Sequence, residues 1–140
     1  MIPRFRSVFS SRLPSTLSFA LFSSTTASSS TPSAYQLRKM SAKDFVESTI
    51  ADNKVVIFSK SWCPYCKKTK ALFAEKFKDV TPLILELDER DDGSDIQNYL
   101  LSKTEQSSVP NVFVSQQHVG GNDDTQAAFK SGKLQELIAQ

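Results

Sequence analysis

A four-residue apolar run, residues 55–58, limits the fold more than any other part of this sequence. Its side chains are only β-branched or aromatic, which favours a strand buried on both faces, as in the centre of an α/β sheet. Pro64, a few residues later, suits the first turn of a helix, where its missing N–H costs nothing. A second apolar run over residues 83–87 follows, preceded by Pro82. The pattern predicts a strand–helix–strand unit with parallel strands and a right-handed crossover.

The rest of the chain predicts further helices and two short strands. An amphipathic helix over residues 41–51 is expected to begin with Ser41 as its N-cap. In the helix after Pro64, the residues expected to face inward are Ala71, Leu72, Ala74 and Phe77. Downstream we predict a helix at 95–102, an antiparallel pair of strands at 112–114 and 118–119, a helix capped by residues 122–124, and a last helix at 134–138. This order predicts an α/β fold with a four-stranded mixed sheet flanked by helices.

The first 39 residues differ in composition from the rest. They hold five basic residues, no acidic residue, 11 serines and 4 threonines. Such a leader is typical of a mitochondrial transit peptide, because an amphipathic basic helix is drawn toward anionic membranes. A secretory signal and a plain disordered tail are the alternatives. We predict a disordered targeting segment over residues 1–39, a folded domain over residues 40–140, and a mitochondrial location with a cytoplasmic short form starting at Met40.

Residues 40–140 carry 12 basic and 15 acidic side chains. A nucleic-acid-binding domain would need a basic stripe within its folded part. No apolar run approaches the roughly 18 residues that cross a bilayer. These features argue against a nucleic-acid partner and against a transmembrane segment.

The only two cysteines, Cys63 and Cys66, stand three positions apart. A disulfide between them would close a very small ring and would constrain almost none of the chain. The cysteines of a secreted disulfide scaffold are instead spread along the sequence. A structural zinc site needs four ligands, and His118 is the only histidine, so we expect no metal. The pair therefore predicts redox chemistry.

Cys63 is the predicted nucleophile of the pair. A helix N-terminus stabilises a thiolate, and the Cys66 thiol can donate a hydrogen bond to it. The lysines expected to add to this effect are Lys60, Lys67 and Lys68. Cys63 precedes the helix and should be the more exposed thiol, whereas Cys66 lies inside the helix. We therefore assign catalysis to Cys63, with Cys66 as the resolving thiol.

Three motifs resemble the glutaredoxin family of the dithiol, Cys-Pro-Tyr-Cys type. They are residues 60–66 (Lys-Ser-Trp-Cys-Pro-Tyr-Cys), Val109-Pro110 and residues 120–124 (Gly-Gly-Asn-Asp-Asp), and the resemblance covers residues 41–140. It implies a thioredoxin-like fold and a glutathione-dependent thiol–disulfide oxidoreductase. Glutathione would be the co-substrate, and glutathionylated proteins and protein disulfides the substrates. Glutathione reductase would act indirectly, and the protein is expected to be a monomer.

The resemblance also implies which residues bind glutathione. Lys60 and Gln97 would reach the glycine carboxylate, and Tyr65 would line the groove. The family often has a threonine before its Val-Pro pair and a basic residue before that threonine. Here these positions are Ser108 and Ser107. Without the basic residue, binding of the glycine carboxylate should depend more on Lys60.

The remaining glutathione contacts come from two loops. Pro110 would form a cis peptide bond that aims the Val109 backbone at the cysteinyl unit of glutathione. Gly121 would let the backbone approach the ligand. Asp123 would offer its N–H to the γ-glutamyl carboxylate, and Asp124 would take the ligand's amine, although both could serve only as helix caps.

Two other functions are compatible with the motif. Some glutaredoxins carry an iron–sulfur cluster ligated by the nucleophilic cysteine and glutathione. Pro64 argues against this alternative, because cluster-binding relatives usually have Ser or Gly there. A thioredoxin-type reductase fed by a flavoenzyme is the second alternative.

Overall fold

The computed structural model describes residues 41–140. The predicted targeting segment and the alternative start at Met40 lie outside these residues. The elements are α2 (Ala42–Asp52), β1 (Val55–Ser59), α3 (Pro64–Lys76), β2 (Leu83–Glu86), the short 3-10 helix η1 (Leu87–Glu89), α4 (Gly93–Thr104), β3 (Asn111–Val114), β4 (Gln117–Gly120), α5 (Asn122–Lys130) and α6 (Lys133–Ala139). Among the described residues, no helix has both the length and the apolar character needed to cross a membrane.

The four strands form one mixed sheet in the order β2-β1-β3-β4. β1 is parallel to β2, with Ile57 beside Ile84, and antiparallel to β3, with Ile57 beside Val112. β3 and β4 form the predicted antiparallel pair. The structure confirms the four-stranded mixed sheet and the parallel strand–helix–strand unit.

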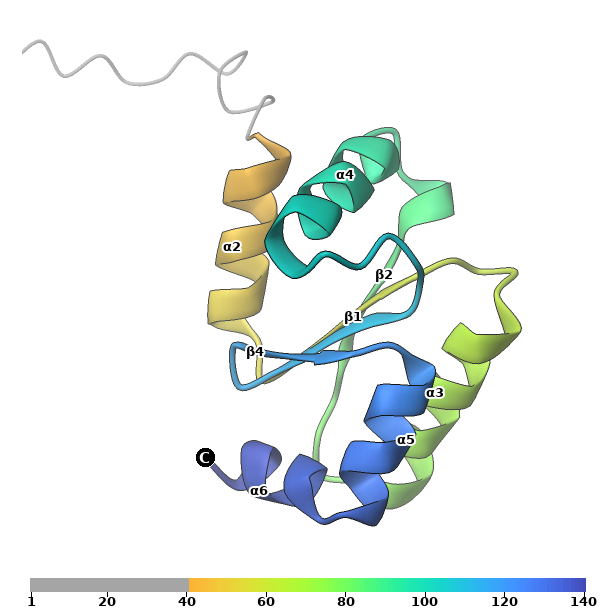
Figure 1. Ribbon diagram of the computed structural model, residues 1–140, viewed down its shortest axis with the longest axis vertical. Helices are drawn as coiled ribbons and strands as arrows, with labels where there is room; N and C mark the ends of the chain where they lie inside the picture. The colour runs from red at the N-terminus through yellow and green to blue at the C-terminus, as the bar shows by residue number, and fades with distance from the viewer. Residues whose placement is uncertain (1–40) are drawn as a thin grey trace, which may run out of the picture. The chain divides into compact units, whose positions relative to one another are not determined.

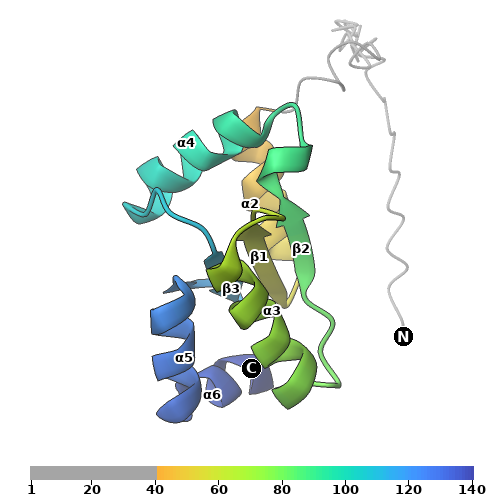
Figure 2. The same cartoon turned by 90° about the vertical axis from the view of Figure 1, so that its right-hand side faces the viewer.

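Helices cover both faces of the sheet, with α2 and α4 on one side and α3, α5 and α6 on the other (Figures 1 and 2). The side chains of β1 alternate between the two cores. Val56 and Phe58 pack with residues of α2 and α4, whereas Val55 and Ile57 pack with residues of α3 and α6. Every residue of β1 is buried, which explains why the run lacks polar alternation.

The inward face of α3 differs from the prediction. Its buried residues are Cys66, Thr69, Leu72 and Phe73, while Ala71 and Ala74 are exposed. The buried positions recur every three or four residues from Cys66, as helix geometry requires. Leu72 and the half-buried Phe77 do face the core as predicted, but Cys66 and Thr69, rather than the alanines, complete the buried face. One consequence is that the resolving-thiol candidate belongs to the core face of the helix.

The start of α5 also differs by one position from the expectation. Gly121 is the N-cap, so Asn122, Asp123 and Asp124 occupy the first turn of the helix. The Asp124 carboxylate accepts a hydrogen bond from the Gly121 N–H at 3.3 Å. Asp124 therefore still accepts a hydrogen bond from a free N–H group at the helix start, but it does so from within the first turn.

Candidate active site

The Cys63 thiol stands at the N-cap of α3, directly after the loop that leaves the central strand. The Cys63 carbonyl accepts the first helical hydrogen bond, from the Lys67 N–H at 3.2 Å, and Pro64 occupies the first turn. The loop before it is fixed by Asp88 of η1, whose carboxylate accepts hydrogen bonds from both the backbone N–H (2.9 Å) and the hydroxyl of Ser61. These contacts hold the thiol at the positive end of the helix.

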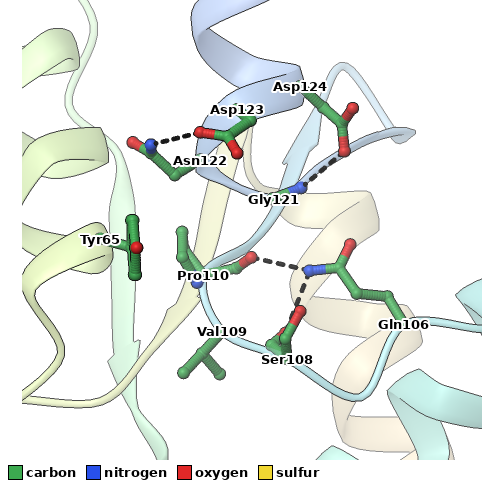
Figure 3. A pocket seen from close by; sticks show the side chains of 9 residues that line it. All are labelled: Tyr65, Gln106, Ser108, Val109, Pro110, Gly121, Asn122, Asp123 and Asp124. Atoms are coloured by element: carbon green, nitrogen blue, oxygen red, sulfur yellow. Dashed lines mark hydrogen bonds between the residues drawn. The ribbon is translucent and has the colours of Figure 1, made fainter.

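A second loop, before β3, approaches the same thiol. The Cys63 Sγ lies 3.8 Å from the carbonyl oxygen of Val109. The Val109–Pro110 peptide bond is cis, as predicted. Gln106 ties this loop together, because its Nε2 donates to the carbonyl oxygens of Ser108 (3.0 Å) and Pro110 (2.8 Å) (Figure 3). The backbone of Val109 is thus fixed beside the sulfur.

The two thiols have opposite pKa shifts. Burial works to raise the pKa of the Cys63 thiol, which is only 5% exposed. Hydrogen bonds from the backbone N–H groups of Cys66 and Tyr65 and from the Cys66 thiol, together with the charge of Lys70, outweigh burial, so this pKa lies below its ordinary value. Burial raises the pKa of the Cys66 thiol, which is fully buried, and the neighbouring Cys63 raises it further. Cys63 is therefore the thiol of the pair that ionises more readily.

Lys70 is the cation that acts on Cys63. It lies one turn after Cys66 on α3, and its ammonium pairs with the Glu86 carboxylate at the end of β2. The two side chains are only 22% and 21% exposed. Charges in such a position are screened less by solvent and salt than charges on the open surface. Lys70 can therefore lower the pKa of Cys63 from within the fold.

The lysines expected to do this occupy other positions. The Lys60 ammonium lies 5.9 Å from the ring centre of Trp62, and the Lys68 ammonium 5.6 Å from that of Tyr65. Lys67 is exposed. The charge that lowers the pKa of Cys63 most is therefore that of Lys70 and not that of the three expected lysines. The position of Lys70 depends on its pairing with Glu86 of β2, a contact between elements that the sequence alone does not show.

Replacing Lys70 with methionine should raise the pKa of Cys63. The substitution removes the ammonium and leaves the Glu86 carboxylate unpaired, and both changes disfavour a thiolate. Glu86→Gln should lower this pKa, because Lys70 then acts without its counter-charge. Alkylation of Cys63 at a pH below the pKa should slow about threefold in Lys70→Met. Thiolate absorbance during a pH titration measures both shifts, with exposed Lys76→Met as the unshifted control. Shifts of the same sign in Lys70→Met and Glu86→Gln would contradict this assignment.

A groove of about 410 Å³ lies between α3, the Val109 loop and the start of α5 (Figure 3). It brings together six of the predicted glutathione-site residues, namely Tyr65, Val109, Pro110, Gly121, Asp123 and Asp124. Lys60 and Gln97 do not line it. The Gln97 Nε2 instead donates to the Ser107 carbonyl at 2.6 Å, at the base of the Val109 loop.

Three further lining residues are not among the glutathione contacts that the resemblance implies: Gln106, Ser108 and Asn122. Gln106 carried no signal, because a glutamine between a helix and a strand is common. Asn122 lies within the motif at residues 120–124, and Ser108 directly precedes the Val109-Pro110 motif. Within those motifs, only the fold tells which neighbours face the groove.

The α5 end of the groove combines opposite preferences. The backbone N–H groups at the start of a helix attract an anion. The carboxylates of Asp123 and Asp124 attract a cation, and Asp123 also accepts a hydrogen bond from the Asn122 amide at 3.1 Å. This end is therefore suited to a ligand that carries a carboxylate and an ammonium group close together.

A cysteine of lowered pKa at a helix N-terminus, a buried partner thiol and a groove beside them are suited to thiol–disulfide exchange. Together with the sheet order, they define a thiol–disulfide oxidoreductase of thioredoxin-like fold. The glutaredoxin family model matches residues 55–119. Glutaredoxin-C4 of Arabidopsis thaliana is 50% identical over 95 residues, which cover 68% of this chain and 69% of that protein. Glutaredoxin-1 of Rhizophagus irregularis is 54% identical over 97 residues, 69% of this chain and 94% of that protein.

Solved structures agree with these relatives. The crystal structure of a buckwheat glutaredoxin–glutathione complex superposes with a TM-score of 0.67 at 35% identity, covering 77% of this chain and 94% of that one. The chain belongs to the glutaredoxin family of glutathione-dependent thiol oxidoreductases.

Proposed function

We propose that this protein reduces protein–glutathione mixed disulfides through Cys63, with Cys66 as the resolving thiol for protein disulfides. The observation that carries the proposal is the pair of opposite pKa shifts beside the groove, where the Cys63 sulfur lies 3.8 Å from the carbonyl oxygen of Val109. The pKa of Cys63 is lowered by hydrogen bonds and Lys70 against the effect of burial, while burial raises that of Cys66. Only the thiolate attacks a disulfide, so the reaction begins at Cys63.

The first step exchanges one disulfide for another. The Cys63 thiolate attacks the glutathione sulfur of the mixed disulfide, the bond to the protein sulfur breaks, and the released protein thiolate takes up a proton. A second glutathione, as its thiolate, then attacks the glutathione sulfur on Cys63. Oxidised glutathione leaves, and the Cys63 thiolate is restored. Overall, the mixed disulfide and one free glutathione become the protein thiol and oxidised glutathione, whose second half comes from the mixed disulfide.

The groove offers a partner to each part of glutathione. The carbonyl oxygen of Val109 lies 3.8 Å from the Cys63 sulfur. The backbone of Val109 would therefore pair with the cysteinyl unit of glutathione. The start of α5 would take the γ-glutamyl carboxylate, and Asp124 the amine. Lys60, outside the groove, would reach the glycine carboxylate by extending its flexible side chain.

Protein disulfides require the second thiol. After Cys63 has attacked, one substrate sulfur is bonded to Cys63. The Cys66 thiol gives up its proton and displaces that substrate sulfur, which leaves as a thiol, so that a Cys63–Cys66 disulfide forms. Two glutathione molecules then reduce this disulfide. The raised pKa of Cys66 keeps it protonated until Cys63 is consumed. Loss of the negative charge on Cys63 removes one cause of that raised pKa, so the joined state itself favours the second attack.

A coupled assay tests the proposal. The substrate is the mixed disulfide of glutathione and 2-mercaptoethanol, with glutathione, glutathione reductase and NADPH supplied. Turnover is expected here, and none when thioredoxin reductase replaces both glutathione and glutathione reductase. The reverse preference would overturn the proposal. The cluster-carrier alternative would use the same thiol and glutathione, and visible absorption of protein purified without oxygen would reveal it.

A further inference from the structure

We propose that Trp62, Lys67 and Lys68 form a docking surface for the protein half of the mixed disulfide, and that this surface favours substrate segments with acidic side chains beside the modified cysteine. The inference rests on the proposed function and names the class of protein substrate. Trp62, Lys67 and Lys68 are called the docking surface below.

Trp62 is the apolar part of the docking surface. It is 66% exposed, more than any other large hydrophobic side chain in residues 41–140, and it directly precedes Cys63. It does not line the groove, which is lined on this side by Tyr65. An exposed tryptophan beside a nucleophile is suited to contact a second molecule, because the indole ring gives a large contact area at low entropic cost.

Lys67 and Lys68 supply the charge. Both are exposed in the first turn of α3, and neither takes part in any of the three ion pairs of the described residues. Lys60, by contrast, has a nearby counter-charge in Asp88. Two exposed ammonium groups without an ion-pair partner, on the helix whose N-cap is Cys63, attract an anionic segment and steer its approach.

The groove restricts where the protein half can lie. Glutathione would occupy the groove, and the attacked sulfur would stand between the Cys63 sulfur and the leaving protein sulfur. The protein segment must therefore lie outside the groove, over the surface next to Cys63. Acidic side chains would be repelled from the α5 end by Asp123 and Asp124 and drawn toward the lysines of α3. The site is thus electrically asymmetric, and the asymmetry selects both the charge and the placement of the substrate.

Synthetic peptides provide the test, using the full chain. Three peptides share one sequence with a single glutathionylated cysteine, flanked on each side by glutamate, glutamine or lysine. The expected order of kcat/KM is glutamate, then glutamine, then lysine. The first and last should differ by about fivefold at low salt, as two partly screened charge pairs allow, and this difference should shrink as salt is added.

The variants separate the docking surface from general charge. The double variant Lys67→Glu with Lys68→Glu should abolish or reverse the preference for the acidic peptide. The matched control is Lys76→Glu with Lys78→Glu, which makes the same change in net charge at the far end of α3 and should keep the preference. Trp62→Ala should lower kcat/KM for all three peptides about threefold relative to the 2-mercaptoethanol mixed disulfide. Each kcat/KM for a peptide is divided by the kcat/KM of the same variant for the small substrate. An effect of a changed Cys63 pKa is common to both values and cancels in this ratio.

Each outcome has one meaning. Equal rates for the three peptides in the unmodified protein would overturn the docking surface while leaving the proposed function intact. The same loss of preference in both double variants would also overturn it, because the effect would then be one of net charge. No reduction of any glutathionylated peptide, together with no turnover of the small substrate, would be a failure of the proposed function itself.

Discussion

Cys63→Ser should abolish turnover of the small mixed disulfide, whereas Cys66→Ser should retain most of it. A serine hydroxyl does not ionise at neutral pH, so the first variant loses the nucleophile, and we expect a fall of roughly a thousandfold or more. Cys66 is not needed when glutathione itself completes the cycle. It also donates a hydrogen bond that lowers the pKa of Cys63, and a serine at position 66 can still donate one.

Cys66→Ala is the informative control for this pair. It removes the hydrogen-bond donor as well as the resolving thiol, so the pKa of Cys63 should rise and the rate at low pH should fall below that of Cys66→Ser. A pH–rate profile in the coupled assay measures the difference, and mass spectrometry should find glutathione joined to Cys63 in Cys66→Ser. Equal losses in Cys63→Ser and Cys66→Ser would reject the division of roles between the two thiols.

The central part of the fold could be predicted from the sequence, because the residues that determine it are close together in the chain. The buried run of β1 and the proline at the start of α3 place the thiol at a helix N-terminus without any knowledge of distant contacts. The cis peptide bond at Pro110 and six of the groove residues were instead implied by the resemblance of three short motifs to the glutaredoxin family. The strand and the helix start depend on a few neighbouring residues, whereas the groove joins separate segments that only the family resemblance brought together.

The features that sequence reasoning missed depend on contacts between elements. Lys70 acts on Cys63 from a largely buried position, where it pairs with Glu86 of β2, sixteen positions further along the chain. Gln106 holds the Val109 loop by hydrogen bonds to two backbone carbonyl groups. Every residue has a backbone carbonyl, so the sequence does not indicate which of them a side chain binds. Residue type alone could not separate these two side chains from ordinary exposed ones.

Gly93→Ala should strongly destabilise the protein, although helix propensity predicts the reverse. Gly93 is the first residue of α4, and alanine is favoured over glycine within a helix by about 1 kcal/mol. Here a β-carbon at position 93 would stand 1.8 Å from the carbonyl oxygen of Leu87 and 2.8 Å from its carbonyl carbon. These are backbone atoms, so no side-chain rotation relieves the clash, and either η1 or the start of α4 must move.

Neither segment can move without disturbing the core. Leu87 packs in the same cluster as Ile96 and Leu100 of α4, so separating the two segments exposes apolar surface. We expect a loss of about 3 kcal/mol in the free energy of unfolding and a fall in Tm of roughly 15 °C. The same substitution at Gly132 is the control: its β-carbon would meet nothing within 4 Å, and only its φ of 83° opposes alanine. That strain should cost about 1 kcal/mol. Thermal denaturation of the two variants side by side tests the argument, because a Gly93→Ala protein as stable as the parent would mean that the contact between α4 and η1 is not fixed.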